Sequence, residues 1–160
     1  MKSIITLAAV GLVAFGSAGS VTAAGFKFSP ASTKFVGKGA TSATTSTGVT
    51  VQCKGTLRGA TTATGVGKVT GGSFTDGGGT NGEFCPDVSF AGTPWKMTAT
   101  TATTATIVGV DFSSPAGACG PANMVVTLSG GVFTYNVPFA GCTVQFSLTT
   151  TPTVSIVPKT

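Results

Sequence analysis

Residues 142–148, Cys-Thr-Val-Gln-Phe-Ser-Leu, alternate between apolar side chains at even positions and polar side chains at odd positions. This period of two is typical of a β-strand with one buried and one wet face, as in an antiparallel sheet. The same alternation returns in residues 154–156 and 49–54, where it places Cys53 on the buried face. Because helix signals are nearly absent after residue 24, the pattern predicts an all-β protein.

Further short strands are predicted by β-branched and aromatic composition at 34–36, 56–58, 67–74, 87–90, 96–100, 106–112, 124–129 and 132–137. Gly130-Gly131 separates the last two and predicts a two-residue hairpin. Residues 39–47 are small and polar and predict a loop or a weakly specified edge strand, whereas residues 75–83 predict a Gly-rich turn. About ten short strands with regular breaks predict an antiparallel β-sandwich or jelly roll.

The first 24 residues have the three-part layout of a secretory signal peptide. Lys2 is the positive residue, residues 4–15 are apolar and uncharged, and small residues lead to a cleavage site after Ala24. We expect residues 25–160 to form a single secreted domain, extracellular or at the cell surface, with the periplasm as an open alternative. No later apolar run is long enough for a helical span, so the mature chain is expected to carry no transmembrane segment.

The four cysteines lie in the exported part of the chain, at Cys53, Cys85, Cys119 and Cys142. An even count in an exported protein predicts two disulfides. Three pairings are open to four cysteines. We favour Cys53 with Cys85 and Cys119 with Cys142, because loops of that size need no crossing of the chain.

The composition excludes most catalytic chemistry. Charged residues make up 8% of the chain and histidine is absent, which rules out a Ser-His-Asp triad, a Cys-His pair and a His-ligated zinc site. Asp76, Glu83 and Asp87 stand among glycines and an asparagine, where turn residues that bond their own backbone are expected. Calcium at this loop is left open. We predict no enzyme, no catalytic residue, no metal and no cofactor, and cations too few for nucleic acid.

Four aromatic residues are candidates for an apolar contact with a partner or an interface. Phe26 and Phe28 alternate with Lys27 just after the cleavage site, Phe35 follows, and Trp95 is the single tryptophan. An exposed apolar N-terminal stretch would be adhesive. The alternative, which we favour for Trp95 as well, is that these rings pack in the core.

The chain resembles a family of small exported bacterial proteins, the "protein activator of alkane oxidation" family of the PraA/PraB type. The likeness runs over residues 26–125, and its most specific feature is the order Cys, Cys, Pro-Trp, Cys-Gly. It is carried by Phe28-Ser29-Pro30, Thr33 to Phe35, Val51-x-Cys53, residues 56–59, Gly72-Ser73-Phe74, Cys85, Thr93-Pro94-Trp95, Thr106-Ile107 and Cys119-Gly120. The resemblance implies an extracellular or surface protein linked to growth on hydrocarbons and to cell-surface or biofilm properties, and it brings no catalytic residues.

Two functions follow as hypotheses. In the first, a low-charge, disulfide-locked domain adsorbs at an oil–water interface and improves access to hydrocarbon without chemistry of its own. In the second, the chain polymerises as a fibre or adhesin subunit, and the arm of residues 25–36 adds a strand to the sheet edge of the next copy. The arm separates the two, because in a monomer it is already paired within its own chain.

Overall fold

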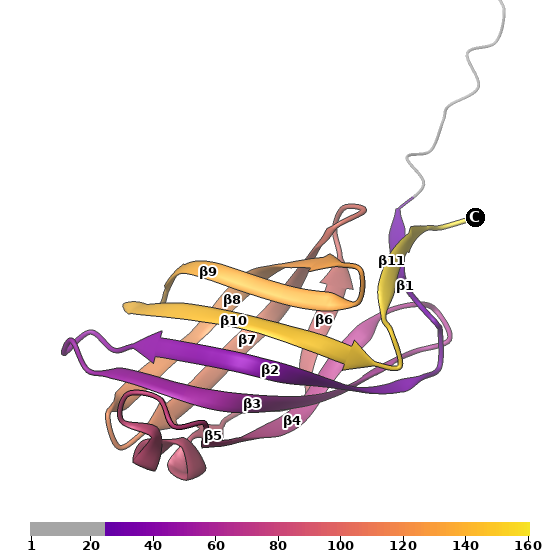
Figure 1. Cartoon of the computed structure of the whole chain (residues 1–160). Coiled ribbons are helices and arrows are strands. Elements are labelled where there is room, and N and C mark those ends of the chain that lie inside the picture. The colour runs from indigo at the N-terminus through magenta and orange to yellow at the C-terminus, as the bar shows by residue number, and fades with distance from the viewer. Residues whose placement is uncertain (1–24) are drawn as a thin grey trace, which may run out of the picture.

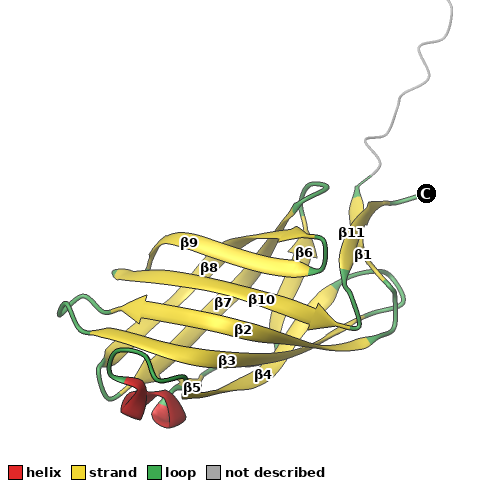
Figure 2. Cartoon of the chain, viewed as in Figure 1, coloured by secondary structure: helices red, strands yellow, loops and turns green. Residues whose placement is uncertain are grey.

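The computed structural model describes residues 25–160, which form a two-stranded ribbon and a large curved sheet (Figures 1 and 2). The predicted signal peptide and its cleavage site lie outside the described residues. In chain order the elements are β1 (Phe26–Ser29), β2 (Lys34–Thr44), β3 (Thr50–Thr61), β4 (Gly67–Asp76), the 3-10 helix η1 (Gly82–Asp87), β5 (Ser89–Phe90), β6 (Trp95–Ala99), β7 (Thr104–Ser114), β8 (Gly117–Ser129), β9 (Val132–Phe139), β10 (Cys142–Thr151) and β11 (Ser155–Pro158).

The large sheet closes on itself into a barrel. Its neighbours run β7-β6-β4-β3-β2-β10-β9-β8, and β8 pairs again with β7. All of these pairings are antiparallel, so the eight strands follow one another around the wall in chain order. The short strand β5 extends the same edge of β7 beyond β6. The all-β prediction is confirmed.

The predicted sandwich or jelly roll is wrong. Alternation of apolar and polar residues requires only one dry face and one wet face, and a sheet that closes on itself satisfies it as well as two packed sheets do. What decides between them is the pairing of β2 with β10, from Thr44 with Thr143 to Val36 with Thr151. The paired residues are 99 to 115 positions apart in the sequence, so local periodicity cannot report the contact.

The predictions of strand faces and turns agree with the structure more closely than the prediction of the overall architecture does. In β10 the side chains of Cys142, Val144 and Leu148 are buried and that of Phe146 is half-buried, while the odd-numbered residues between them are exposed. Gly130 and Gly131 form the β8–β9 turn with φ values of 58° and 79°, the left-handed region that a two-residue hairpin requires. Residues 39–44 are not a loop or a weak edge, because β2 runs on to Thr44 and pairs with β3 on one side and β10 on the other, whereas residues 45–47 do lie in the turn between β2 and β3.

One end of the barrel is closed by the ribbon of β1 and β11. Phe28 of β1 has no exposed surface, and Phe35 and Phe133, whose ring centroids are 6.1 Å apart, are also buried at this end. The inner wall makes room for them with glycine. A Cβ on Gly59 would collide with the Phe35 ring, and one on Gly67 would lie 3.1 Å from the Phe28 ring. The closed end is therefore a packed aromatic plug.

The hydrogen-bonded wall is interrupted at two places. β4 and β6 share only three residue pairs, and so do β8 and β9, although β4 and β8 continue for many residues further. Each interruption has a disulfide beside it. Cys53–Cys85 ties η1 to β3 next to the first, and Cys119–Cys142 joins β8 to β10 across the second. The favoured cysteine pairing is confirmed, and the bridges stand where backbone pairing is missing.

Candidate functional site: an apolar chamber inside the barrel

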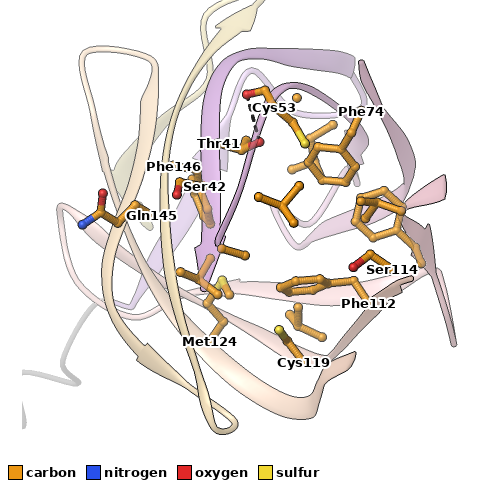
Figure 3. A pocket seen from close by; sticks show the side chains of 18 of the residues that line it. Thr41, Ser42, Cys53, Phe74, Phe112, Ser114, Cys119, Met124, Gln145 and Phe146 are labelled. Atoms are coloured by element: carbon orange, nitrogen blue, oxygen red, sulfur yellow. Dashed lines mark hydrogen bonds between the residues drawn. The ribbon is translucent and has the colours of Figure 1, made fainter. Parts of the chain in front are cut away.

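The barrel contains a chamber of ≈ 110 Å³ in the half that lies away from the ribbon (Figure 3). Its wall comes from inward positions of β2, β3, β4, β6, β7, β8 and β10, with β5 between β4 and β7. Aliphatic side chains make up much of it: Val51, Leu57, Val69, Ile107, Val110, Met124, Val144 and Leu148. They come from strands distant in sequence, which closure of the barrel brings together.

Aromatic rings line the side of the chamber where β4 and β6 part. The ring centroids of Phe74 and Phe90 are 5.4 Å apart, and those of Phe90 and Trp95 are 5.2 Å apart in an edge-to-face arrangement. The indole Nε1–H of Trp95 donates to the carbonyl oxygen of Ala91 at 2.8 Å, so its polar edge is satisfied. Its apolar body is left to face the chamber.

Within residues 25–160, no ionisable side chain lines the chamber. The polar residues along its lining are Thr41, Ser42, Thr45, Thr56, Ser114 and Gln145. Of these, the Gln145 side chain points away from the chamber (Figure 3), where its amide donates to Asn136 Oδ1 at 2.8 Å. Among the described residues, no buried side-chain nitrogen or oxygen atom lacks a hydrogen-bond partner. The chamber therefore offers dispersion contacts and no unfilled polar group to hold water or a charged ligand, which is the chemistry of a site for an apolar molecule.

Glycine on the inner wall shapes the space. Gly55 lies on β3, and a Cβ there would come within 2.6 Å of the Thr41 methyl and 3.2 Å of the Phe74 ring. A Cβ on Gly72 of β4 would lie 2.8 Å from the Phe90 ring. Larger residues would force these rings from their places, so the glycines allow an aromatic wall on strongly curved strands.

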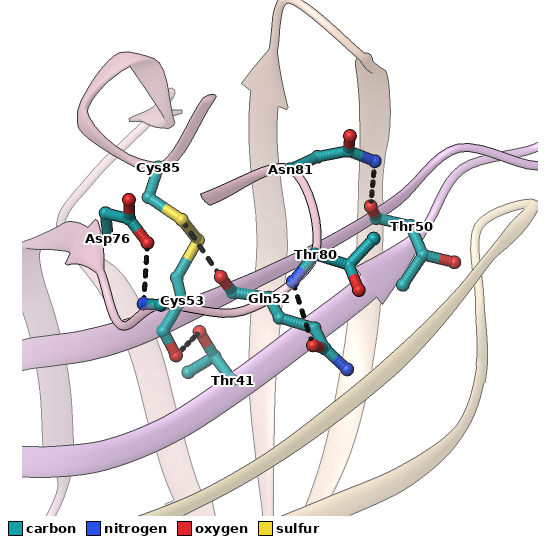
Figure 4. Close-up of a disulfide and its surroundings, with 9 residues drawn as sticks. Thr41, Thr50, Gln52, Cys53, Asp76, Thr80, Asn81 and Cys85 are labelled. Atoms are coloured by element: carbon teal, nitrogen blue, oxygen red, sulfur yellow. Dashed lines mark hydrogen bonds between the residues drawn. A yellow bond between two sulfur atoms is a disulfide. The ribbon is translucent and has the colours of Figure 1, made fainter. Parts of the chain in front are cut away.

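The chamber's end opposite the ribbon carries η1, seen at the lower left of Figure 1. Cys85 of η1 is fully buried and bonded to Cys53 (Figure 4), and Phe84 and Ala116 pack partly buried against the same small cluster. Asn81 Nδ2 donates to the Thr50 carbonyl at 2.6 Å and holds the preceding loop along β3. Several chamber aromatics, among them Phe74, Phe90, Phe112 and Phe146, are only half-buried. Because the inward rings that keep some exposed surface lie in the half away from the ribbon, we infer that the mouth of the chamber is on this side.

The four aromatic residues predicted as apolar contacts are not gathered on the surface. Phe28 and Phe35 form the plug at the closed end, and Trp95, which is 4% exposed, lines the chamber. Phe26 is partly buried against the core. Sequence reasoning singled out Trp95 but missed the other chamber residues, because each lies at an ordinary core position of its own strand.

The N-terminal arm is paired within its own chain. β1 runs antiparallel to β11, from Phe26 with Pro158 to Ser29 with Ser155. On its other side, the Phe28 amide donates to the Gly65 carbonyl at 2.9 Å. Both sides of β1 are thus engaged in the same molecule.

The carboxylates of the Gly-rich loop do not converge. Asp76 Oδ1 accepts the Gly78 amide at 2.7 Å, the bond of a turn residue to its own backbone. Within residues 25–160 no three His, Cys, Asp or Glu side chains are grouped so as to hold a metal ion. The same part of the chain contains no helix of the length and hydropathy needed to cross a bilayer.

A closed antiparallel wall around an apolar chamber defines a small β-barrel whose interior is not completely filled by side chains. The chain belongs to the alkane oxidation protein activator PraA/PraB-like family, whose model matches residues 1–158. No curated protein matches the chain, and no solved structure does.

Proposed function

We propose that the protein is an exported, non-enzymatic aid to hydrocarbon access that takes the end of an alkyl chain into its barrel. The observation that carries the proposal is the chamber, which is apolar and, within residues 25–160, lined by no ionisable side chain. Family membership supplies the context, since the family is described as an activator of alkane oxidation. An apolar binder acts on oxidation by presenting substrate, without a reaction of its own.

The size of the chamber sets how much of the hydrocarbon enters. An apolar cavity of about 150 Å³ binds benzene, and this chamber measures ≈ 110 Å³. It therefore takes about four or five carbons, the terminal segment of a long alkane. At about 0.8 kcal/mol per methylene the gain is roughly 3–4 kcal/mol, which corresponds to dissociation constants on the order of millimolar.

Binding of this strength suits an interface better than a carrier in water. A chain end can enter the mouth while the rest of the molecule stays in the oil, and chain ends at an oil surface are concentrated enough to keep the single chamber occupied despite weak binding. Adsorption through an exposed apolar patch has less support. The exposed large hydrophobic residues among those described are Val108, Val125 and Val137, and their exposed fractions are 44–58%.

Trp95 provides the assay, because it is the single tryptophan and lines the chamber. Bromine quenches indole fluorescence at contact, so 1-bromobutane and 1-bromohexane report occupation directly. We expect saturable quenching with half-saturation in the millimolar range. Val144→Phe fills the chamber from β10 and should raise the bromoalkane concentration at half-saturation at least tenfold. Ser114→Phe should have the same effect from the mouth. The matched control Val108→Phe places the same ring on the outer wall and should leave quenching unchanged.

The functional consequence is measured with oil. Wild-type protein and Val108→Phe should lower hexadecane–water interfacial tension and raise hexadecane oxidation by cells, whereas Val144→Phe should do neither. Linear, non-saturating quenching that is equal in all variants would refute chain capture. Filaments in size-exclusion chromatography and negative-stain microscopy without oil would instead revive the fibre hypothesis.

A further inference from the structure

Six of the positively charged residues gather on one side of the barrel. The chain has nine Lys and Arg, of which Lys2 precedes the described residues. Of the remaining eight, six point outward from four neighbouring strands, β2, β3, β4 and β6, and all six are exposed: Lys34, Lys38, Lys54, Arg58, Lys68 and Lys96. We call this set the basic face.

The strand register brings three of these lysines into one row. Lys34 of β2 lies opposite Ala60 of β3, Ala60 lies opposite Lys68 of β4, and Lys68 lies opposite Lys96 of β6. Lys68 and Lys96 are direct cross-strand partners. Like charges in such a pair destabilise a sheet. The stability of the isolated barrel therefore does not explain why the two lysines face each other.

The other side of the barrel is nearly without charge. Strands β7 to β10 contain no Lys or Arg, and their one carboxylate is Asp111. The remaining acidic residues, Asp76, Glu83 and Asp87, lie between the end of β4 and the end of η1, near the mouth of the chamber. The protein is therefore electrically one-sided, although its overall charge is small.

We propose that the basic face docks the protein on an anionic lipid membrane. From the row of Lys34 to the level of Lys54 the face extends six residues along the strands, roughly 20 Å, and it curves over four of the eight strands of the closed wall. Lysine side chains are long and flexible, so those at the flanks can turn toward the same anionic plane as those at the centre. The outward positions between them carry Thr, Ser, Ala and Gln side chains and one valine, Val36, so a polar headgroup layer meets a mostly polar surface.

A nucleic acid fits this face poorly. Proteins that bind single strands use aromatic side chains on which bases stack, and the outward positions of β2, β3, β4 and β6 carry none. A membrane also agrees with the chamber, because the basic face lies on the wall of the barrel and the mouth lies at its end. One molecule can then hold a chain end at the mouth while its wall contacts a charged surface. This combination rests on the proposed function, whereas membrane docking does not depend on it.

Vesicle co-sedimentation without hydrocarbon tests docking separately from chain capture. The vesicles are phosphatidylcholine alone or phosphatidylcholine with 30% phosphatidylglycerol, at 20 mM and 500 mM NaCl. Binding is expected only to the anionic vesicles at low salt, since screening at high ionic strength removes it. Lys68→Gln/Lys96→Gln should reduce binding roughly 30-fold, because each cation near an anionic surface contributes about fivefold. The matched control Lys27→Gln/Lys159→Gln loses the same charge outside the face and should bind nearly as wild type.

The outcomes separate the alternatives. An equal loss in both double variants would show that net charge, not the face, controls binding, and would overturn the proposal. So would equal binding to neutral vesicles, or competition by dextran sulfate or duplex DNA at lower charge concentration than the vesicles. Circular dichroism of the variants verifies folding, which surface Lys→Gln changes should preserve. Val144→Phe should still dock, so failure of chain capture and failure of docking are distinguishable.

Discussion

Removing one disulfide at a time measures what each contributes to the barrel. The variants are Cys119→Ala/Cys142→Ala and Cys53→Ala/Cys85→Ala. Alanine is preferred to serine because these side chains are 0–8% exposed, and a buried hydroxyl without a partner would add its own penalty. The closed loops span 23 and 32 residues. Loop entropy then predicts losses of about 3.4 and about 3.7 kcal/mol in the free energy of unfolding.

Urea denaturation followed by circular dichroism measures these losses, and the melting temperature should fall by roughly 10–15 °C in each variant. The two values should agree within about 0.5 kcal/mol, because the loops differ little in length. A loss below about 1 kcal/mol in either variant, or a difference above about 2 kcal/mol, would refute the chain-entropy reasoning. Wild-type protein in dithiothreitol should have a lower free energy of unfolding than either variant, since reduction opens both loops.

Three further predictions concern the plug and the inner wall. Phe28→Ala should destabilise the protein by about 3–5 kcal/mol, because the ring is fully buried; a loss under 1 kcal/mol in urea would show that the ribbon does not close the barrel. Gly59→Ala should lower the free energy of unfolding by about 1–3 kcal/mol. Gly37→Ala should be tolerated, because its Cβ would lie 3.4 Å from Leu148. Equal melting temperatures of the two variants would contradict this reasoning. Burial raises the pKa of the Tyr135 phenol above 10.0, so its contribution to stability is complete below that pH and lost as the pH rises through the raised value. Tyr135→Phe should show a smaller fall in urea midpoint between pH 9 and pH 12, and an unchanged fall would count against the assignment.

The sequence predicted the parts of this fold that depend on near neighbours. Alternation in residues 142–148 identified the buried face of β10, and Gly130-Gly131 identified a hairpin, because each depends on a few adjacent residues. Residues 39–44 were mistaken for a loop or weak edge because Gly, Ala, Thr and Ser have weak strand preference. In the barrel these residues pair on both sides, and small side chains suit a wall beside the chamber.

Closure and the chamber could not be predicted in the same way. Leu57, Ile107 and Val144 are ordinary inward residues of three strands, and nothing in their surroundings in sequence distinguishes a packed core from a cavity. The basic face was hidden for the same reason. Lys34, Lys68 and Lys96 are spread over 63 positions, and only the register of four strands aligns them.

The connectivity of the barrel also shapes how it must fold. Strands β2 to β9 can zip together from neighbouring hairpins, but the ring is complete only when β10 reaches β2, which is the contact of greatest sequence separation in the wall. Topologies dominated by such distant pairings fold slowly. Until that last step, β2 and β10 expose long backbone edges rich in Thr, Ala and Gly, with Lys34 and Lys38 as their only charged residues. The hazardous species for aggregation is therefore the open ring during folding, and the time it stays open sets how much protein is lost.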